Sequence, residues 1–479
     1  MSVQDLPKGF PINEEDWKQT PPAVRTFLLQ QHELIGQLVK RIEELETKLG
    51  QNSKNSNRPP STDGPQVNRE KRTSRGRQPG GQAGHEGKHR ELLPVEEMDH
   101  VHNFYPDQCE KCSLLLNHDS ARETPTPIRH QVFEIPEIKP IRTEYRCHEI
   151  ECSCGHRTRA SLPPEVAQSN FGPRVHAFVS YLTSSHFGTR RGAREILDTV
   201  FGIDISLGSI CNVLERVSTE SAPVVEEVRE TLPEAEALNI DETTWKSKGD
   251  RRTLWVFVSP LVVYFSIAAS RGASVLSAIL GDVFPGIITS DDHSAYRAYH
   301  KNGLRQLCWA HLIRKFKALL EIRGSPDAQR FATNMLNEID SLFICWYAFV
   351  DKAISRQQLR ETTALIRGRM KRYCQQYQTS EDAAVSTRAS QMLKKWKHLF
   401  TFIFHEGVEP TNNAAERALR HAVQWRKICF GSQSENGERF TGRLLTITRT
   451  CRLQGKNPFH FLCDLMESAF NNGTRPSLV

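Results

Sequence analysis

The sequence contains 479 residues, roughly three times the length of a typical domain, which argues against a single compact unit. Hydrophobic residues make up 38% and charged residues 25%, a composition that excludes a wholly disordered chain. The net charge of +7 is too small to identify a polyanionic partner by itself.

The positive charge is concentrated in two segments of the chain. Residues 50–90 and residues 412–456 each hold nine Lys or Arg against three Asp or Glu, so the rest of the chain is slightly acidic. Two basic segments favour local contacts with phosphate backbones, although either one alone could be a solvated run of charge.

The first residues lack the basic start and apolar stretch of a secretory signal, so we expect a cytoplasmic protein. The longest apolar run, 254–269, is interrupted by Ser259 and Pro260 and predicts two buried strands, not a membrane span. In a reducing compartment the 12 cysteines should not form disulfides, and clustered cysteines indicate a metal site.

Residues 1–49 are predicted to contain a leucine-zipper-like helix that associates with a second copy of the chain. Apolar residues recur at two heptad positions, with Gln31 as the only polar break and with Glu and Lys between them. The alternative is an amphipathic helix packed on its own domain. The apolar heptad residues are Val24, Leu28, Ile35, Leu38, Ile42, Leu45 and Leu49.

Residues 50–94 have the composition of a flexible basic linker. Gly, Pro, Asn, Ser and Arg dominate this segment, which cannot bury enough apolar surface to offset the entropy of ordering. Its Lys and Arg side chains would add affinity for DNA through counterion release, with little sequence specificity.

Residues 95–165 predict a small zinc-binding knuckle. Cys109 and Cys112 form a C-x2-C pair, and a second cluster of cysteines follows 35 to 40 residues later. This pattern fits a tetrahedral structural site in which the metal replaces a missing core. Cys152 and Cys154 complete the expected ligand set, with Cys147 as an alternative ligand. Reduced thiols without a metal are the other interpretation.

Residues 170–232 predict a helix-turn-helix DNA-binding region. Three segments have apolar residues at helical spacing, with Gly202 ending the second helix and Ser206 capping the third. The helix Ser206–Val217 would then occupy the recognition position, with Ser209 in its first turn as the candidate DNA contact. Any three-helix bundle has a similar pattern.

Residues 233–320 change from helical to strand periodicity and predict the first part of a catalytic core. Three consecutive strands, a helix, a strand, a helix and another strand are the order of a ribonuclease H-like mixed sheet. In that fold the first and fourth strands are neighbours. Asp241 and Asp291, which are expected to end these two strands, should therefore lie side by side.

Two neighbouring aspartates on a rigid sheet can hold a pair of Mg²⁺ ions for an in-line phosphoryl displacement. Glu416, in a helix-favouring run after Asn412 and Asn413, is the candidate third carboxylate. The first of the nine basic residues of the C-terminal basic segment follows directly after it, which favours a bound polyanion. The candidate DNA contacts are Arg417, Arg420, Arg426 and Lys427.

Each of these residues also has a purely structural interpretation. Asp241 could end a strand, Asp291 could cap the following helix, and Glu416 could pair with Arg420 four residues on. His311 is interpreted as a structural histidine at a helix start, with support of the metal site or a DNA contact as alternatives.

Nine motifs taken together resemble the large transposase of the insertion-sequence-66 family. They occur in order along nearly the whole chain: NSKNSNRPPSTDG, the first Cys pair, FGIDISLGSI, NIDETTW, SDDHSAY, CWAHLIRKF, NNAAERALR, RKICFGSQSENG and GKNPFHFL. The resemblance implies a leucine-zipper-like helix, a zinc knuckle, a helix-turn-helix and a DDE catalytic domain of ribonuclease H type. Its catalytic acids match Asp241, Asp291 and Glu416.

The resemblance also implies a helical insertion, residues 321–409, between the second and third acids, with the core completed by residues 410–479. Two positions depart from the family pattern. The second zinc pair is normally C-x2-C, whereas this chain has Cys152-Ser-Cys154. The doublet Asp291-Asp292 leaves Asp292 as an alternative second acid.

These features predict a multidomain α/β DNA transposase that binds terminal inverted repeats and cuts and joins strands with two Mg²⁺ ions, with Zn²⁺ in a structural role. The expected partners are double-stranded DNA, further copies of the chain and small accessory proteins of the same element, at the bacterial nucleoid. A catalytically inactive or domesticated DNA-binding regulator is the alternative. A ribonuclease H-like nuclease or resolvase is a third interpretation.

Overall fold

A computed structural model describes residues 12–50, 90–117, 128–322 and 324–479. The chain separates into two compact units. The larger comprises Met1–Val67, Glu144–Leu197 and Asp204–Val479, and the smaller comprises Asn68–Thr143 and Asp198–Ile203. In the described part of the chain, no helix has both the length and the apolarity needed to cross a membrane.

The N-terminal part consists of α1 (Glu14–Gln19) and α2 (Pro22–Gly50), so the predicted helix over residues 24–49 is confirmed. Self-association through its apolar face stays a prediction. Most of the predicted linker, 50–94, lies outside the described residues. Heptad side chains that are 44% to 57% exposed are Val24, Ile35, Leu38, Ile42 and Leu45.

The described residues of the segments that carry the cysteine pairs contain little regular structure. Their elements are one 3-10 turn, η2 (Val95–Glu97), and an antiparallel hairpin of β1 (Glu149–Glu151) and β2 (Arg157–Arg159). Every residue of the two strands is exposed, so the hairpin contributes nothing to an apolar core. A metal ion can replace a core in such a segment.

Three helices lie where they were predicted, after the short α3 (Pro164–Ala167): α4 (Pro173–Ser185), α5 (Arg190–Phe201) and α6 (Leu207–Glu230). Gly202 follows α5 with φ +61°, and the Ser206 hydroxyl accepts the N–H of Ser209 at 3.0 Å. α6 continues well beyond Val217, because its buried face packs against α4 and α15. DNA recognition by this region stays a prediction.

The centre of the larger unit is a five-stranded mixed sheet in the order β5-β4-β3-β6-β7. Pairing is antiparallel on the β5-β4-β3 side and parallel from β3 through β6 to β7, as the predicted fold requires. The strands are β3 (Ala237–Ser247), β4 (Asp250–Val258), β5 (Val263–Ala268), β6 (Ile287–Ser290) and β7 (Arg305–Leu307). The helices between them are α7 (Ala273–Leu280), α8 (Ser294–Tyr299) and, after β7, α9 (Trp309–Leu320).

The prediction that the first strand ends at Asp241 is wrong. β3 continues to Ser247 because its second half is paired with β4 in a hairpin, whose turn residues Lys248 and Gly249 have φ values of +50° and +89°. Pairing with β6 stops earlier, where Asn239 faces Thr289. Asp241 therefore lies just beyond the end of the parallel ladder, next to the residues that follow β6.

Side chains alternate between the two faces of β3, which separates the acids of NIDETTW. Leu238 and Ile240 belong to the core on one face of the sheet, and Trp245 belongs to a second core on the other. Asp241 shares the face of Trp245, whereas Glu242 shares the face of Ile240.

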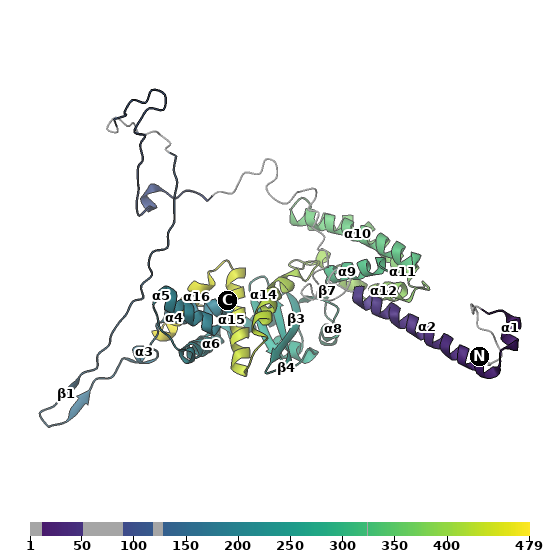
Figure 1. The fold of residues 1–479 in the computed structure, drawn as a ribbon, viewed down its shortest axis with the longest axis horizontal. Coiled ribbons are helices and arrows are strands. Elements are labelled where there is room, and N and C mark those ends of the chain that lie inside the picture. The colour runs from purple at the N-terminus through teal and green to yellow at the C-terminus, as the bar shows by residue number, and fades with distance from the viewer. Residues whose placement is uncertain (1–11, 51–89, 118–127, 323) are drawn as a thin grey trace. The chain divides into compact units, whose positions relative to one another are not determined.

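The predicted helical insertion, 321–409, is helical in the structure and shares an apolar core with β7 and α9. Its helices, green in Figure 1, are α10 (Pro326–Val350), α11 (Arg356–Tyr377), α12 (Ala383–Lys394), η5 (Trp396–His398) and α13 (Thr401–Phe404).

The remaining helices cover the sheet. Figure 1 shows α14 beside β3 and β4, where its apolar side packs on the face that carries Trp245. α15 packs against β5 and α6, and α16 packs against α4. The bounds are α14 (Asn413–Cys429), α15 (Glu435–Leu453) and α16 (Pro458–Phe470).

Candidate active site

Asp241 lies within β3 on the face that α14 covers. Its Oδ1 accepts the backbone N–H of Glu242 at 2.9 Å. Burial raises the pKa of Asp241 well above its usual range, and the charges of Glu242, Asp291 and Glu416 raise it further. The last two are the other predicted acids, so all three contribute to one electrostatic environment.

Asp291 follows directly after β6, and its Oδ1 accepts the backbone N–H of His293 at 2.8 Å. The neighbouring Asp292 is engaged elsewhere, in an ion pair with Lys395 of the insertion. Of the two aspartates, Asp291 is the one whose charge raises the pKa values of Asp241 and Glu416. The structure therefore favours Asp291 over Asp292 as a partner of the other acids.

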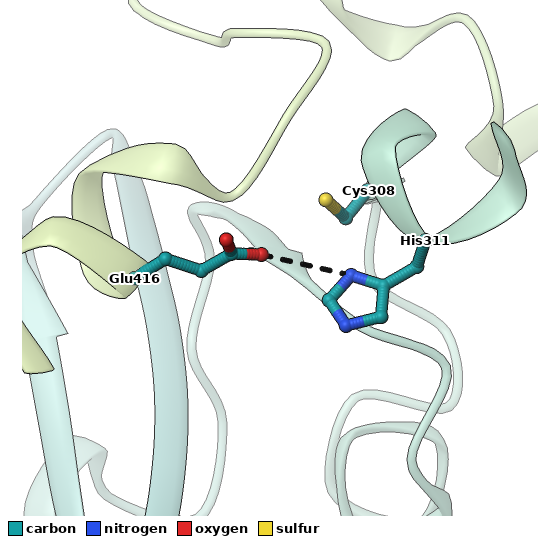
Figure 2. Close-up of side chains that lie close together, drawn as sticks. All are labelled: Cys308, His311 and Glu416. Atoms are coloured by element: carbon teal, nitrogen blue, oxygen red, sulfur yellow. Dashed lines mark ion pairs between the residues drawn. The ribbon is translucent and has the colours of Figure 1, made fainter. Parts of the chain in front are cut away.

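Glu416 lies in the first turn of α14. Its Oε1 is 3.8 Å from Nδ1 of His311, which approaches from α9 (Figure 2), and also 3.8 Å from Nη2 of Arg314. Burial raises the pKa of Glu416, Arg314 and Arg420 oppose that rise, and Asp291 adds to it. The nearby cations therefore lower the pKa of Glu416, whereas the neighbouring carboxylate raises it.

His311 does more than begin a helix, because with Cys308 it faces Glu416. The ligand atoms of these three residues all lie within 4.8 Å of one another (Figure 2). Burial raises the pKa of the Cys308 thiol to about 11, while burial, Arg314 and Lys315 lower the pKa of His311 to about 3. Both side chains are therefore neutral at pH 7.

Asn412 holds the elements of the site together. Its Nδ2 donates to the carbonyl of Ile240 at 2.9 Å, and its Oδ1 accepts from Nδ2 of Asn239 at 3.1 Å. Its backbone N–H donates to Cys308 Sγ at 3.2 Å. Asn412 is the N-cap residue of α14, and Asn is favoured at that position, but its side chain forms no cap hydrogen bond and instead joins the strand of Asp241 to the helix of Glu416.

Arg426 differs from the other predicted DNA contacts because the protein itself engages its guanidinium. Nη1 donates to the hydroxyls of Thr243 at 3.0 Å and Thr244 at 2.8 Å, and also to the carbonyl of Thr244. This cluster fixes the far end of α14 to β3. Arg417, Arg420 and Lys427 are exposed instead, spaced so that they follow one side of the helix.

Sequence reasoning missed a group of cations that surrounds the aspartate doublet. Lys315 is half-buried, and burial, Arg388 and Lys395 lower its pKa, whereas Asp292 and Asp291 raise it. Arg388 and Lys395 come from the insertion, so only the fold brings them to Lys315. The signal available in the sequence was the RKFK run one turn after His311.

Glu242 belongs to a separate network on the opposite face of the sheet. Its Oε1 accepts from Nη2 of Arg271 at 2.8 Å, and Tyr296 donates its hydroxyl to Oε2. With both oxygens engaged and the side chain 1% exposed, Glu242 is a structural carboxylate.

The predicted zinc ligands lie in turns that suit thiolates. In the smaller unit, backbone N–H groups of Lys111 and Cys112 lower the pKa of Cys109, and Ser113 adopts φ +57°. In the larger unit, Cys154 and Ser153 lower the pKa of Cys152. Because the pairs lie in different units, a shared zinc ion stays a prediction, with Cys147 as the alternative ligand.

Ser209, the predicted DNA contact of α6, is used in the helix cap. Besides its N–H bond, its hydroxyl oxygen lies 2.9 Å from that of Ser206. The side chain is half-buried, so a role in DNA binding stays a prediction.

Comparison with known proteins identifies the chain's relatives. The model of the transposase IS66 family matches residues 168–439, which include all three predicted acids, and a family of unknown function matches residues 19–91. Two uncharacterized proteins of Sinorhizobium fredii are similar. The protein y4hP is 25% identical over 70% of this chain and 66% of its own length, and y4qI is 26% identical over 54% and 53%.

This chain therefore spans between about half and two thirds of the length of these relatives. The transposase family model matches more than half of the chain, in one continuous stretch that covers α4 to the start of α15. The chain belongs to the transposase IS66 family.

Proposed function

We propose that this protein is a DNA transposase that cuts and joins strands by a DDE mechanism at Asp241, Asp291 and Glu416. The observation that carries the proposal is that β3 and β6 are paired neighbours and that α14 packs on β3, so the charges of Asp291 and Glu416 reach Asp241 and add to the rise of its pKa that burial causes. Nothing in the sequence order brings them together, since 50 and 125 residues separate them.

The residues fit a divalent cation. Asp241 keeps a raised pKa because it is buried and because nearby carboxylates repel its charge, and Oε1 of Glu416 is buried without a hydrogen-bond partner. A cation would relieve both conditions. We propose that the three carboxylates hold two Mg²⁺ ions, which would activate a water or a 3′-hydroxyl and stabilise the leaving oxygen.

The chain's own cations would hold the DNA against these acids. Arg417, Arg420 and Lys427 present a basic stripe on α14, and Lys315 and Arg388 lie beside the aspartate doublet. Such side chains contact phosphates and orient the strand, but they do not read sequence.

Sequence recognition is assigned to other parts of the chain. We propose that the cysteine-rich region, 95–165, binds structural zinc and that it and the region 170–232 bind the terminal inverted repeats. The helix within residues 1–49 would join two copies, and small accessory proteins of the same element would take part in the assembled complex.

Strand transfer with a labelled terminal repeat tests the catalytic proposal. With Mg²⁺ or Mn²⁺, we expect Asp241→Asn, Asp291→Asn and Glu416→Gln each to lose at least about 100-fold in rate, because each removes a carboxylate from the site. Asp292→Asn is the matched control and should retain activity. Activity in all three variants would contradict the assignment of these residues as the catalytic acids. If the wild-type protein is inactive but still binds the repeats, the alternative of a catalytically inactive DNA-binding regulator would be favoured.

A further inference from the structure

Cys308, His311 and Glu416 form a compact group of metal ligands beside the proposed catalytic site. Among the described residues they are the one group of three or more His, Cys, Asp or Glu side chains whose ligand atoms lie within 4.8 Å of one another. Figure 2 shows the thiol and the imidazole, both from the start of α9, facing the carboxylate from α14.

The sulfur of Cys308 has the surroundings of a metal-bound thiolate. It is 2% exposed and accepts the backbone N–H of Asn412 at 3.2 Å. It also lies at the N-terminus of α9, where N–H groups of Ala310 and His311 point towards it. These donors favour the ionised form of the cysteine, but burial outweighs them and keeps the metal-free thiol protonated, so the thiolate would form only when a cation binds.

The other two ligand atoms are buried without a hydrogen-bond partner. Neither Nδ1 of His311 nor Oε1 of Glu416 forms a hydrogen bond, although each is hidden from solvent. An unsatisfied buried polar atom is destabilising, and a bound cation would satisfy both of these. Arg314, 3.8 Å from the same carboxylate oxygen, would partly oppose a cation.

We propose that Cys308, His311 and Glu416 form a further metal site, selective for Zn²⁺ or a similar thiophilic ion, with Glu416 as a ligand shared with the proposed Mg²⁺ site. A thiolate, an imidazole and a carboxylate suit Zn²⁺, and three protein ligands leave one position open. Mg²⁺ prefers an all-oxygen site and would leave the thiol alone. Binding releases the thiol proton of Cys308 to solvent.

The consequence for activity rests on the proposed function. An ion held by Cys308 and His311 keeps Glu416 from the Mg²⁺ site, so Zn²⁺ inhibits strand cleavage by competing for one carboxylate. The binding itself does not depend on catalysis.

Cobalt binding tests the site directly. Metal-free full-length protein is titrated with Co²⁺, whose sulfur-to-cobalt absorption reports each thiolate bound. Cys308→Ser should bind one Co²⁺ fewer than Cys451→Ser, a matched control whose thiol is equally buried but lies in the core on the other face of the sheet. Equal numbers of Co²⁺ in the two variants would overturn the proposal.

A second variant covers the case in which Cys308→Ser fails to fold. His311→Gln removes one ligand and should weaken the same Co²⁺ equivalent by about 10-fold or more. Unchanged affinity in folded His311→Gln would also overturn the site. Any cobalt bound at the cysteine-rich region is common to all variants and cancels in the comparison.

Inhibition by Zn²⁺ at fixed Mg²⁺ then tests the competition. Relative to each protein's own zinc-free rate, half-inhibition should require about 10-fold more Zn²⁺ in Cys308→Ser than in Cys451→Ser. An equal requirement contradicts the competition. If the proposed catalysis is wrong, no cleavage is seen while the cobalt difference remains, and inactive Asp241→Asn should still bind the Co²⁺ equivalent.

Discussion

Burial of Asp241 destabilises the metal-free native state at neutral pH. Its native pKa is raised by burial and by Glu242, Asp291 and Glu416, whereas an unfolded aspartate titrates near its ordinary value. Between these two pKa values the unfolded state ionises and the native state does not. Stability is therefore lost as pH rises from the unfolded towards the native pKa, and the loss is absent in acid, where both states are protonated.

Asp241→Asn should consequently raise the stability of the metal-free protein by about 0.5 to 2 kcal/mol at pH 7, the range of typical stabilising changes. The amide can still accept the N–H of Glu242 that Asp241 accepts. Urea unfolding in the presence of a chelator measures the effect, which should shrink as the pH falls below the ordinary aspartate pKa.

Asp292→Asn is the matched control, because its carboxylate forms an ion pair with Lys395 and should not gain stability. A metal-free Asp241→Asn protein that is less stable than wild type at pH 7 would contradict the account of Asp241.

The residues that carry chemistry could be predicted from the sequence better than those that position them. Asp241 and Glu416 have local motifs, but the bonds of Asn412 to Asn239 and Ile240 join positions more than 170 residues apart. The engagement of Arg426 with β3 is similarly remote, so its charge alone indicated a DNA contact. No local pattern encodes such pairings.

At the scale of elements, both edges of the sheet are covered by hydrogen-bonding groups from elsewhere. On edge strand β5, the N–H of Phe265 donates to Thr446 Oγ1 and the N–H of Val263 donates to Thr450 Oγ1, each at 3.0 Å. On edge strand β7, Thr401 Oγ1 donates to the carbonyl of Arg305 at 2.6 Å. Covered edges cannot pair with another chain.

Thr446→Val should lower the free energy of unfolding by about 1 to 3 kcal/mol, because the buried N–H of Phe265 loses its acceptor. Thr448→Val provides the comparison on the same helix. Its hydroxyl is also buried but bonds to the Leu444 carbonyl of α15 itself, so no N–H is orphaned. Equal losses in urea unfolding for the two variants would mean that the edge contact contributes nothing specific.

Strand and helix positions followed from periodicity, but strand ends did not. The pattern placed β3 and β6 as neighbours, and the observed register agrees. The sequence pattern predicted that β3 ends at Asp241, because a charged residue after an apolar stretch usually indicates the end of a strand. The hairpin with β4 overrides that signal, since pairing continues through Lys246 and Arg251 to Ser247 and Asp250.

At the scale of the whole molecule, the number of basic residues in a segment overstates how many of them are free to contact DNA. The basic segment 412–456 includes Arg426, which is bound to β3, and Arg443, which donates to the carbonyl of Ser218 at 2.9 Å. Burial lowers the pKa of Arg449 to about 10. The exposed cations of this segment are Arg417, Arg420 and Lys427 on α14 and Arg439, Arg452 and Lys456 beyond it.

Association of two copies of the chain through α2 can be tested directly. Its heptad face is exposed within one copy, with Leu38 at 53%. If two copies pair through this face, Leu38→Glu places a charge in the seam and should weaken the dimer at least tenfold, or about 1.4 kcal/mol. Light scattering at increasing concentrations measures the change in mass.

Gln37→Glu is the matched control, because it adds the same charge one position away from the seam and should leave the dimer intact. If α2 instead packs on its own chain, Leu38→Glu should lower the unfolding temperature without changing the mass. The two outcomes differ because a seam between copies depends on protein concentration, whereas a contact within one chain does not. A mass that is equal in both variants and independent of concentration would therefore exclude α2 as the dimerisation element.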